Sequence, residues 1–432
     1  MSKIEELIER LCPNGVEYKT IGEVATYRRG SFPQPYTNSS FYGGDGAMPF
    51  VQVADIEDNG FKLKEKTKQT ISKIAQPKSI YVPKGTVICS IQGTIGRVAI
   101  TQFDSYIDRT IAIFESFKIE INKRFFAYCI ELKFGIEKQF ARGSTLKTIT
   151  KEEFTKFRIP VPPLEVQCEI VHILDDFTEL SAELSAELKA RQKQYEYYRD
   201  KLLTFEEAES LDTLHTHTHT HTHGYFYRQE IKWLKLQEIC KSIKDGMHNL
   251  PKNTLDKSKY PILSAQNIFN GEINFDAKRY VDEETYIKEN KRTNIEKGDV
   301  LLTIVATIGR IAVVKEKNKF LLQRSVCVLK PNELVNPYYL KFYLETYKIQ
   351  NYMITNAHGS AQSGLYLNQV AEIIVPIPSM DIQNKIVTIL TDFYKITHDI
   401  SEGLPAEIEA RQKQYEYYRD KLLTFKELKV NE

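Results

Sequence analysis

Five histidines alternate with threonine near the middle of the chain. In an extended segment, side chains two residues apart point to the same side, so these imidazoles could bind nickel or zinc. A dipeptide repeat is also typical of a low-complexity linker whose length changes by two residues at a time. We favour the linker, and the sequence predicts no metal site and no cofactor. The five are His215, His217, His219, His221 and His223.

The motifs of nucleotide-binding and methyl-transferring enzymes are missing. No glycine is followed by lysine, so there is no Walker A loop, and no GxGxxG occurs. Asn336-Pro337-Tyr338 lacks the second proline of the (N/D)PP(Y/F) motif of amino-methyltransferases, and the only Pro-Pro pair is Pro162-Pro163. We therefore expect a chain that is not itself an enzyme.

A block of sixteen residues, ARQKQYEYYRDKLLTF, occurs twice without a change, at Ala190–Phe205 and Ala410–Phe425. Because the rest of the two halves has diverged, this surface is expected to do one job twice. Recent duplication or recombination of the gene would also leave identical copies. Tyrosine and arginine are enriched at the energetic centres of protein interfaces. In the first copy we expect Tyr195, Tyr197 and Tyr198 to be exposed with Arg191 and Arg199. The side chains expected to bind a partner are Arg191, Tyr195, Tyr198, Arg199, Arg411, Tyr415, Tyr418 and Arg419.

The repeat extends through the whole chain, which makes it the first guide to the fold. IPVPPLEVQ at 159–167 pairs with VPIPSMDIQ at 375–383. Upstream of each lie a KGTV or KGDV motif, at 84–87 and 297–300, and a TIGR motif, at 94–97 and 307–310. The order is therefore variable domain, proline-rich turn and helix, followed by the same three again.

Each proline-rich turn leads into a long amphipathic segment. From Glu165 to Phe205 the apolar residues fall at spacings of three and four, which predicts one helix about 60 Å long. The second copy carries the same stripe, and Gly403 and Pro405 are expected to break or kink it. Two such helices could pack on their own domains, but their shared sequence and similar length favour an antiparallel coiled coil.

Both variable domains mix strands and short helices. Strands are expected at 98–100, 110–113, 300–305 and 311–314, and helices at 125–137 and 337–347. We expect an α/β (α+β) fold with an internal pseudo-two-fold repeat, and 432 residues are enough for two such cores. The expected limits are 1–160 and 225–376 for the domains, 161–206 and 377–432 for the helical spacers, and 207–224 for the linker.

Positive charge is concentrated in the two variable domains. Residues 1–160 contain 24 Lys and Arg against 18 Asp and Glu, and residues 225–375 contain 22 against 16, so each carries +6. Residues 161–224 and 376–432 carry −8 and −2. A polyanion such as nucleic acid would be attracted to the domains, although ordinary scatter can also produce a charge of this size.

Export and membrane insertion are not expected. No run of 18 apolar residues occurs, and Met1–Arg10 is too charged for a signal peptide. The six cysteines form no CxxC pair, which is typical of reduced thiols in the cytoplasm. We expect a cytoplasmic protein that binds no membrane.

These features together resemble the specificity subunit of type I restriction-modification systems. The resemblance rests on the order of the elements, the TIGR motifs, PPLEVQ and PSMDIQ, and KQYEYYRDKLLTF at the end of each helix. It covers nearly the whole chain, although Val166 and Ile382 stand where the family more often has glutamate.

The resemblance implies a division of labour. Each variable domain would be a target-recognition domain that reads one half of a split sequence in double-stranded DNA. The helices would fix the spacing and bind two modification subunits that methylate adenine. Two restriction subunits, which are motor-nucleases, would join for cleavage, making the assembled complex a DNA adenine methyltransferase and endonuclease.

Loops that combine basic, amide and hydroxyl side chains with glycine are the natural candidates for reading DNA. Arginine can bind guanine with two hydrogen bonds, glutamine and asparagine can bind adenine, and lysine and serine more often hold phosphate. A turn residue or a surface charge is at least as common an explanation for any one of them. The candidates are Arg28, Arg29, Gln92, Arg97, Arg142, Ser144, Lys147, Lys244, His248, Asn249, Gln266, Arg310, Ser360 and Gln362.

The TIGR motifs are a special case, because they recur in domains that are expected to read different half-sites. Recurrence favours a backbone role for Thr94, Gly96, Thr307 and Gly309 over base reading. The alternative class of function is a coiled-coil scaffold that joins two protein-binding domains without DNA. Salt-dependent affinity for DNA would separate the two.

Overall fold

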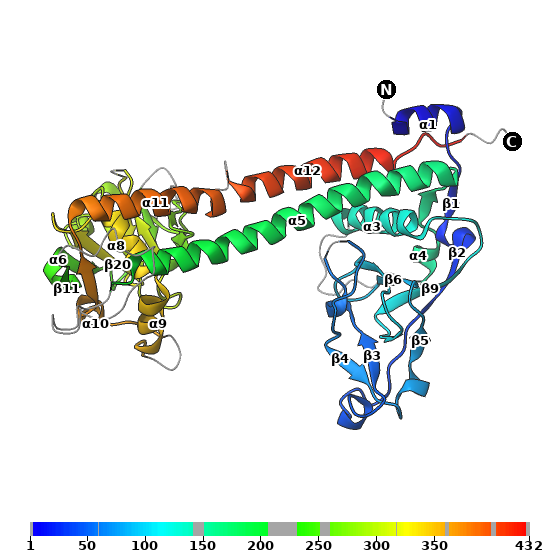
Figure 1. Ribbon diagram of the computed structural model, residues 1–432, viewed down its shortest axis with the longest axis horizontal. Helices are drawn as coiled ribbons and strands as arrows, with labels where there is room; N and C mark the ends of the chain where they lie inside the picture. The colour runs from blue at the N-terminus through cyan, green and yellow to red at the C-terminus, as the bar shows by residue number, and fades with distance from the viewer. Residues whose placement is uncertain are drawn as a thin grey trace, which may run out of the picture. The chain divides into compact units, whose positions relative to one another are not determined.

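The chain forms two compact units, Met1–Ala186 with Glu407–Glu432, and Glu187–Ala406 (Figure 1). Each unit therefore holds one variable domain together with the copy of the repeated block that follows the other domain in sequence. The His-Thr tract lies outside the described residues. The computed structural model describes residues 3–58, 60–140, 151–205, 231–250, 260–316, 318–358, 363–398 and 403–428.

Two sheets form the framework of the first domain. Its strands are β2 (Ala25–Arg29), β3 (Met48–Val51), β4 (Gln69–Ile71), β5 (Ile80–Val82), β6 (Val87–Ser90), β7 (Val98–Ile100), β8 (Ser105–Ile107) and β9 (Ile111–Phe117). One sheet is antiparallel, in the order β2-β9-β6-β7. The other has the order β4-β3-β8-β5, with β3 parallel to β8. The central strand β6 is buried along its whole length, as its apolar sequence requires.

The helices of the first domain cover these sheets. The structure has α1 (Lys3–Leu11), α2 (Ile21–Val24), α3 (Lys123–Phe140), α4 (Lys151–Thr155) and the short 3-10 helices η1 (Ser39–Phe41), η2 (Val53–Asp55) and η3 (Gln76–Lys78). Helix α3 packs on β7 and brings Phe126, Ile130 and Phe134 into the core. This helix confirms the one expected at 125–137.

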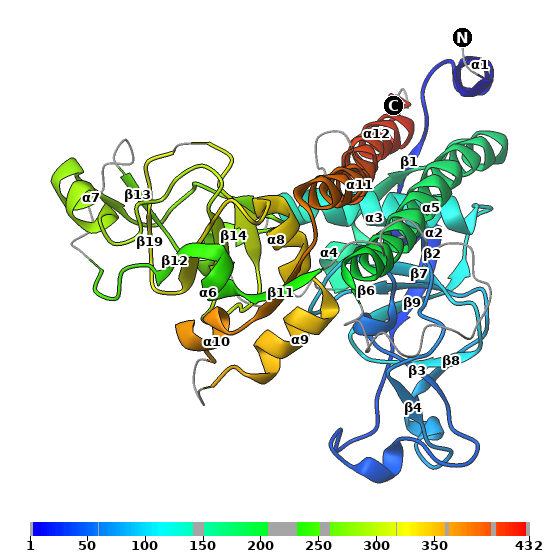
Figure 2. The ribbon, with the colours of Figure 1, turned by 60° about the vertical axis from the view of Figure 1, so that its left-hand side comes forward.

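The second domain repeats the framework of the first. Its strands are β12 (Cys240–Asp245), β13 (Tyr260–Leu263), β14 (Ile268–Phe269), β15 (Glu272–Ile273), β16 (Tyr280–Val281), β17 (Val300–Thr303), β18 (Ile311–Val313), β19 (Leu321–Leu322) and β20 (Val326–Pro331). The antiparallel sheet has the order β12-β20-β17-β18. In the second sheet, β13 runs parallel to β19, as β3 runs parallel to β8 (Figure 2). The expected repeat and fold class are confirmed.

Short helices complete the second domain. They are α6 (Leu236–Ile239), η4 (Ala265–Asn267), α7 (Glu283–Asn290), α8 (Pro337–Leu344), α9 (Tyr347–Thr355) and α10 (Leu367–Ala371). The expected single helix at 337–347 is wrong at its end. Helix α8 ends at Leu344. Thr346 has an extended backbone and is the N-cap residue of α9, which begins at Tyr347.

A two-stranded antiparallel ribbon joins each domain to its helix. The strands are β1 (Tyr18–Thr20) with β10 (Arg158–Pro160), and β11 (Lys232–Lys235) with β21 (Ile374–Ile377). In both ribbons the strand that ends in the proline-rich turn is paired with the strand that enters the domain. The ribbon therefore fixes where each helix starts.

Helix α5 (Leu164–Leu203) follows the first proline-rich turn. Helix α11 (Met380–His398) and then α12 (Leu404–Leu422) follow the second. The second helical segment is interrupted next to Gly403 and Pro405, as expected. In the second unit, the Tyr198 ring lies 6.0 Å from Phe393 and the Tyr195 ring 5.4 Å from His398, so α5 and α11 run in opposite directions. In the first unit, Phe177 of α5 stacks on Tyr418 of α12 at 5.4 Å. The antiparallel pairing of helices is confirmed.

A buried glutamine holds each proline-rich turn against its domain. Gln167 donates from Nε2 to the Pro162 carbonyl at 2.8 Å and accepts from the Asn122 amide at 2.9 Å. Gln383 donates to the Pro378 and Leu334 carbonyls at 2.9 Å each and accepts from the Asn336 amide at 2.8 Å. The recurring glutamine thus ties the start of the long helix to the start of α3 or α8.

Five of the six cysteines are buried and only Cys168 is exposed, with no disulfide among them. Burial raises the pKa of the Cys240 thiol to about 12, and it also raises those of Cys12, Cys129 and Cys327. These thiols stay protonated and unreactive near neutral pH. Within the described residues, no helix is long and apolar enough to cross a membrane, and no group of His, Cys, Asp and Glu side chains is arranged to hold a metal ion.

Candidate functional site

A polar groove of about 670 Å³ opens on the second domain. Its walls come from η4, from the segment before β16, from the TIGR turn between β17 and β18, and from the turn that precedes β20. The exposed side chains on these walls are donors and acceptors of the kind that contact nucleic acid: Gln266, Lys278, Arg279 and Arg324.

Buried amide and hydroxyl groups make the floor of this groove rigid. Asn267 accepts from the Ser264 amide at 3.0 Å and donates from Nδ2 to the Asn274 and Asp276 carbonyls at 3.0 and 3.1 Å. The Ser325 hydroxyl accepts from the Ala265 amide at 3.1 Å. These bonds connect η4 to the turn before β20, so Gln266 and Arg324 project from a fixed backbone.

The first domain has the same turn before β9, with the same central arginine but other side chains beside it. Asp108, Arg109 and Thr110 stand where the second domain has Gln323, Arg324 and Ser325, and the amides of Asp108 and Gln323 donate to the carbonyls of Val51 and Leu263. Asp108 accepts from the amide and hydroxyl of Thr110 at 2.9 and 2.6 Å. Arg109 lies over the Phe32 ring, 4.7 Å from its centroid.

A glycine lets another strand pass close to this turn in each domain. A Cβ on Gly30 would lie 2.4 Å from the carbonyl oxygens of Ile107 and Asp108. A Cβ on Gly246 would lie 2.2 Å from the Leu322 carbonyl oxygen. No other residue fits at either position without moving the backbone.

The candidate residues on β2 and β12 lie at equivalent, exposed positions. Arg28 and Lys244 precede the two glycines by two residues, and Arg29 is exposed beside Arg28. Arg28 pairs with Glu115 at 2.6 Å. After β12, His248 pairs with Asp245 at 2.7 Å. Asn249 is exposed next to His248, and Gln92 is half-buried in the turn after β6.

The two arginines of the TIGR motifs point into their own domains. Arg97 donates to the Ile56 carbonyl at 3.0 Å and pairs with Asp58. Arg310 donates to the Ile268 carbonyl at 3.3 Å and lies over the Phe269 ring. Both guanidinium groups therefore hold the loop after η2 or η4, which favours a structural role over base reading.

The TIGR turns themselves are held by backbone bonds. The Ser90 hydroxyl donates to the Thr94 carbonyl at 2.6 Å and accepts from the Arg97 amide at 2.9 Å, and Thr303 does the same with Thr307 and Arg310. Gly96 and Gly309 have φ angles of 81° and 90° and pack against α3 and α9. The expected backbone role of the motif is confirmed.

Five candidates cannot be placed. Arg142, Ser144, Lys147, Ser360 and Gln362 lie outside the described residues. The groove also contains basic residues that were not among the candidates from the sequence, namely Lys278, Arg279 and Arg324. A signal for Arg324 was present, because DRT at 108–110 and QRS at 323–325 stand in register before the apolar runs of β9 and β20.

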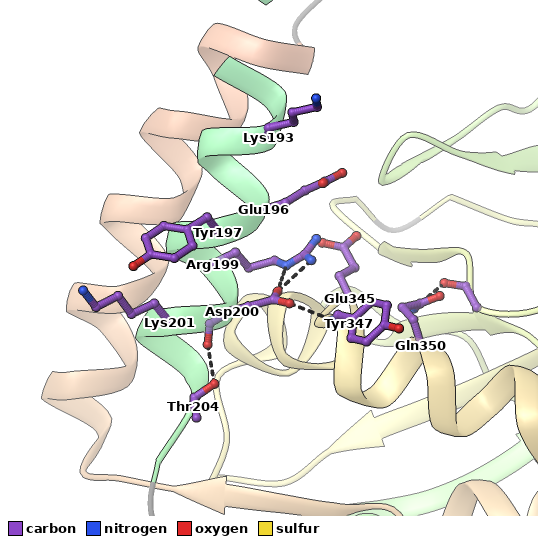
Figure 3. Close-up of a pocket in the computed structure, with 11 residues that line it drawn as sticks. Lys193, Glu196, Tyr197, Arg199, Asp200, Lys201, Thr204, Glu345, Tyr347 and Gln350 are labelled. Carbon is purple, nitrogen blue, oxygen red and sulfur yellow. Dashed lines mark hydrogen bonds and ion pairs between the residues drawn. The ribbon is translucent and has the colours of Figure 1, made fainter. Parts of the chain in front are cut away.

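The first copy of the repeated block turns one face into the second unit (Figure 3). Tyr195 is only 2% exposed, and burial raises its pKa. Arg199 lies over the Tyr195 ring and pairs with Asp200 at 2.7 Å, and the Asp200 carboxylate also accepts from the Tyr347 amide at 3.0 Å. The expectation that Tyr195 and Arg199 are exposed is wrong, because both pack against the domain.

The second copy makes matching contacts in the first unit. Arg419 lies over the Tyr415 ring and pairs with Asp420 at 2.6 Å. The Tyr415 hydroxyl donates to Glu131 of α3 at 3.5 Å. Burial, followed by the charge of Glu131, raises the pKa of Tyr415. Glu131 corresponds to Glu345 in the second domain, whose carboxylate lies beside Arg199 in Figure 3.

The opposite face of each block is exposed. Tyr197 is 60% and Tyr417 61% exposed, and each ring lies 5.3 Å from its neighbour, Tyr198 or Tyr418. Arg191 is exposed, and Arg411 is half-buried. In the second unit this face borders a groove of about 860 Å³ lined by Tyr197, Lys201, Tyr347 and Gln350 (Figure 3). Two identical surfaces, each centred on an exposed tyrosine, are thus available to a partner.

Comparison with known proteins gives a consistent result for both halves. The family model described as the type I restriction modification DNA specificity domain matches residues 13–191 and again 229–410. A putative type I restriction enzyme specificity subunit of Haemophilus influenzae is 32% identical over 320 residues, covering 71% of this chain and 74% of that protein. The EcoR124I/EcoR124II specificity subunit of Escherichia coli is 29% identical, covering 70% and 72%.

A third relative extends over almost the full length. The EcoprrI specificity subunit of Escherichia coli is 27% identical over 423 residues, covering 93% of this chain and 92% of that protein. The fold also matches a chain from a structural study of complex assembly and conformational transition in the type I R-M system. That chain has a TM-score of 0.62 at 14% identity, with 96% and 98% of the two chains covered.

Proposed function

The chain belongs to the type I restriction-modification DNA specificity family, and on that premise we propose that its two domains read the two halves of a split target in double-stranded DNA. The target-recognition domains are residues 1–160 and 225–376, the helical spacers are 161–206 and 377–432, and 207–224 is a linker. Specificity subunits are the non-catalytic members of type I systems, so this chain supplies recognition and its partners supply the chemistry.

The single observation that carries this proposal is the contrast between the framework and the turn surface of the two domains. Their four-stranded antiparallel sheets and TIGR turns match, whereas the exposed side chains beside the turns before β9 and β20 differ. A protein that reads two different short sequences needs the same platform twice with different contacts on it. A half-site reader of this kind takes its base contacts from a few projecting side chains.

The identical blocks support the docking of two copies of one partner. Their inward residues pack alike on the two domains, and their outward residues, centred on Tyr197 and Tyr417, are exposed alike. Two modification subunits that methylate adenine bind there, one on each block, and two restriction subunits join them for cleavage. The complex works in the cytoplasm, where its DNA substrate is.

A genome methylation map tests the proposal. A host that expresses this chain with its modification subunit is compared with a host that expresses the modification subunit alone. We expect adenine methylation at a split motif that appears only when this chain is present. A stable complex that adds no motif would instead support a scaffold that joins two protein-binding domains.

A further inference from the structure

We propose that Arg109 and Arg324 are equivalent base-reading arginines, one for each half-site, and that the side chains around them set which bases are accepted. The inference rests on the proposed function and assigns residues to it. Arg97 and Arg310 of the TIGR motifs were among the candidates expected from the sequence, whereas Arg109 and Arg324 were not.

The backbone places the two arginines alike. The amide of the residue before each arginine donates to the end of the parallel neighbour strand, at 3.0 Å from Asp108 to Val51 and 2.9 Å from Gln323 to Leu263. The same residues then accept from the first amides of β9 and β20, at 3.1 Å from Ile111 and 3.0 Å from Val326. Each arginine is therefore the tip of a tight turn that is bonded on both sides.

The two arginines are exposed, in contrast to Arg97 and Arg310, which are half-buried. Arg97 and Arg310 donate to carbonyl oxygens of their own domains and hold a loop in place. Arg109 lies with its guanidinium over the Phe32 ring, which fixes the group by its face. A guanidinium held by its face keeps its N–H donors in the plane, where they match the two acceptors of guanine.

The side chains around Arg109 differ from those around Arg324, as expected if the two domains read different half-sites. In the second domain, Gln266 and Gln323 line the groove beside Arg324, and amide side chains pair well with adenine. Lys278 and Arg279 on the same wall suit phosphate contacts. In the first domain, Ala54 stands at the position of Gln266, and the Asp108 carboxylate is bonded to Thr110. The second domain therefore reads through an arginine with amides, and the first through a stacked arginine.

Lysine substitutions provide the test, because lysine keeps the positive charge but loses the two-pronged donor geometry. The full chain and its variants are each assembled with the modification subunit, and the methylated motif is mapped. We expect Arg324→Lys to relax one base position by about tenfold or more in the half-site of the second domain and to leave the other half unchanged. Arg109→Lys should relax one position in the other half, and Gln266→Ala a different position in the second.

Lys241→Ala is the matched control, since it removes an exposed positive charge of the second domain outside the groove. It should leave the motif unchanged. A uniform loss of methylation across all sequences in Arg324→Lys, or an unchanged motif in both arginine variants, would overturn the inference. Co-purification with the modification subunit and an unchanged melting temperature show that a variant is folded. A failure of the proposed function itself is distinct, because the unmodified chain would then produce no split motif.

Discussion

The turns before β9 and β20 follow the same backbone path and share an arginine, but the side chains on either side of that arginine differ. Asp108 is buried and bonded to Thr110, whereas Gln323 is half-buried on the wall of a groove. Phe32 stacks against Arg109, and the equivalent residue of the second domain, His248, is paired with Asp245. The contrast indicates that the framework is kept by backbone bonds and buried groups, which leaves the projecting side chains free to diverge.

The helical blocks behave in the opposite way. Here the side chains are identical on two domains that otherwise differ, and in both blocks an arginine lies over a tyrosine whose pKa is raised by burial and by a glutamate of the domain. The proposed docking of one kind of partner on both blocks would keep their surfaces identical. The two domains thus differ where they meet the proposed DNA, and agree where they meet the helices.

Replacing the buried glutamines should lower the stability most, and it tests whether the two frameworks are held in the same way. Gln383→Ala leaves one amide and two carbonyl groups without their partner, and Gln167→Ala leaves one amide and one carbonyl. We expect losses of about 3 and about 2 kcal/mol in the free energy of unfolding. Urea unfolding of the full chain, followed by far-ultraviolet circular dichroism, measures both.

The fluorescence of the single tryptophan separates the two units. Trp233 lies on β11, which pairs with β21 directly before the turn that Gln383 holds. The urea midpoint of the Trp233 fluorescence should fall in Gln383→Ala and should stay unchanged in Gln167→Ala. Gln412→Ala, at an exposed position of α12, is the control for the loss of a glutamine. Equal shifts in all three variants would contradict the role of Gln383 in holding the second proline-rich turn.

Replacing the exposed tyrosines should weaken partner binding, and it tests whether the two helical blocks do the same job. Tyr197→Ala and Tyr417→Ala should each weaken binding of the modification subunit by about tenfold or more, with no change in stability, since both rings are solvent-exposed. Isothermal titration calorimetry should give half-stoichiometric tight binding in each single variant. Tyr366→Ala removes an equally exposed ring elsewhere and should not change binding. Loss at only one of the two tyrosines would show that the identical blocks do different jobs.

A weak pH dependence of stability is expected in the second unit alone. Burial lowers the pKa of His398 below its ordinary value of 6.5, with Lys341 and Arg199 contributing in the same direction. The ring stacks on Tyr394 at 4.2 Å and contacts Tyr195. The folded state therefore favours neutral histidine, so its contribution to stability is complete above pH 6.5 and is lost as the pH falls below that value.

A comparison with a variant isolates this contribution. The urea midpoint of Trp233 fluorescence should fall more between pH 7.5 and 5.5 in the unchanged chain than in His398→Phe, which keeps the stack but cannot be protonated. Thr178 and Ala182 occupy the corresponding positions in α5, so the first unit should lack this dependence. A parallel fall in both proteins would mean that His398 takes no part.

Much of the fold could be predicted from the sequence. The repeat aligned the two halves, the helical periodicity located α5, and Gly403 with Pro405 located the break in the second helical segment. The direction in which each side chain points was harder to predict from the sequence. Tyr195 and Tyr197 differ by two residues in an amphipathic helix, but which one is buried depends on the domain that it meets, and that domain comes from the other half of the chain. The groove was missed because η4 and the turn before β20, 60 residues apart, meet only in the folded domain.

The distribution of the cysteines has a practical consequence. Cys168 is exposed at the start of α5, next to the buried Gln167, while the other five thiols are buried. A maleimide dye will therefore attach at one place on the unmodified chain, without removal of any cysteine. Because that place adjoins the joint between the first domain and its long helix, the dye's emission can report in real time whether the joint moves as DNA and partner subunits are added.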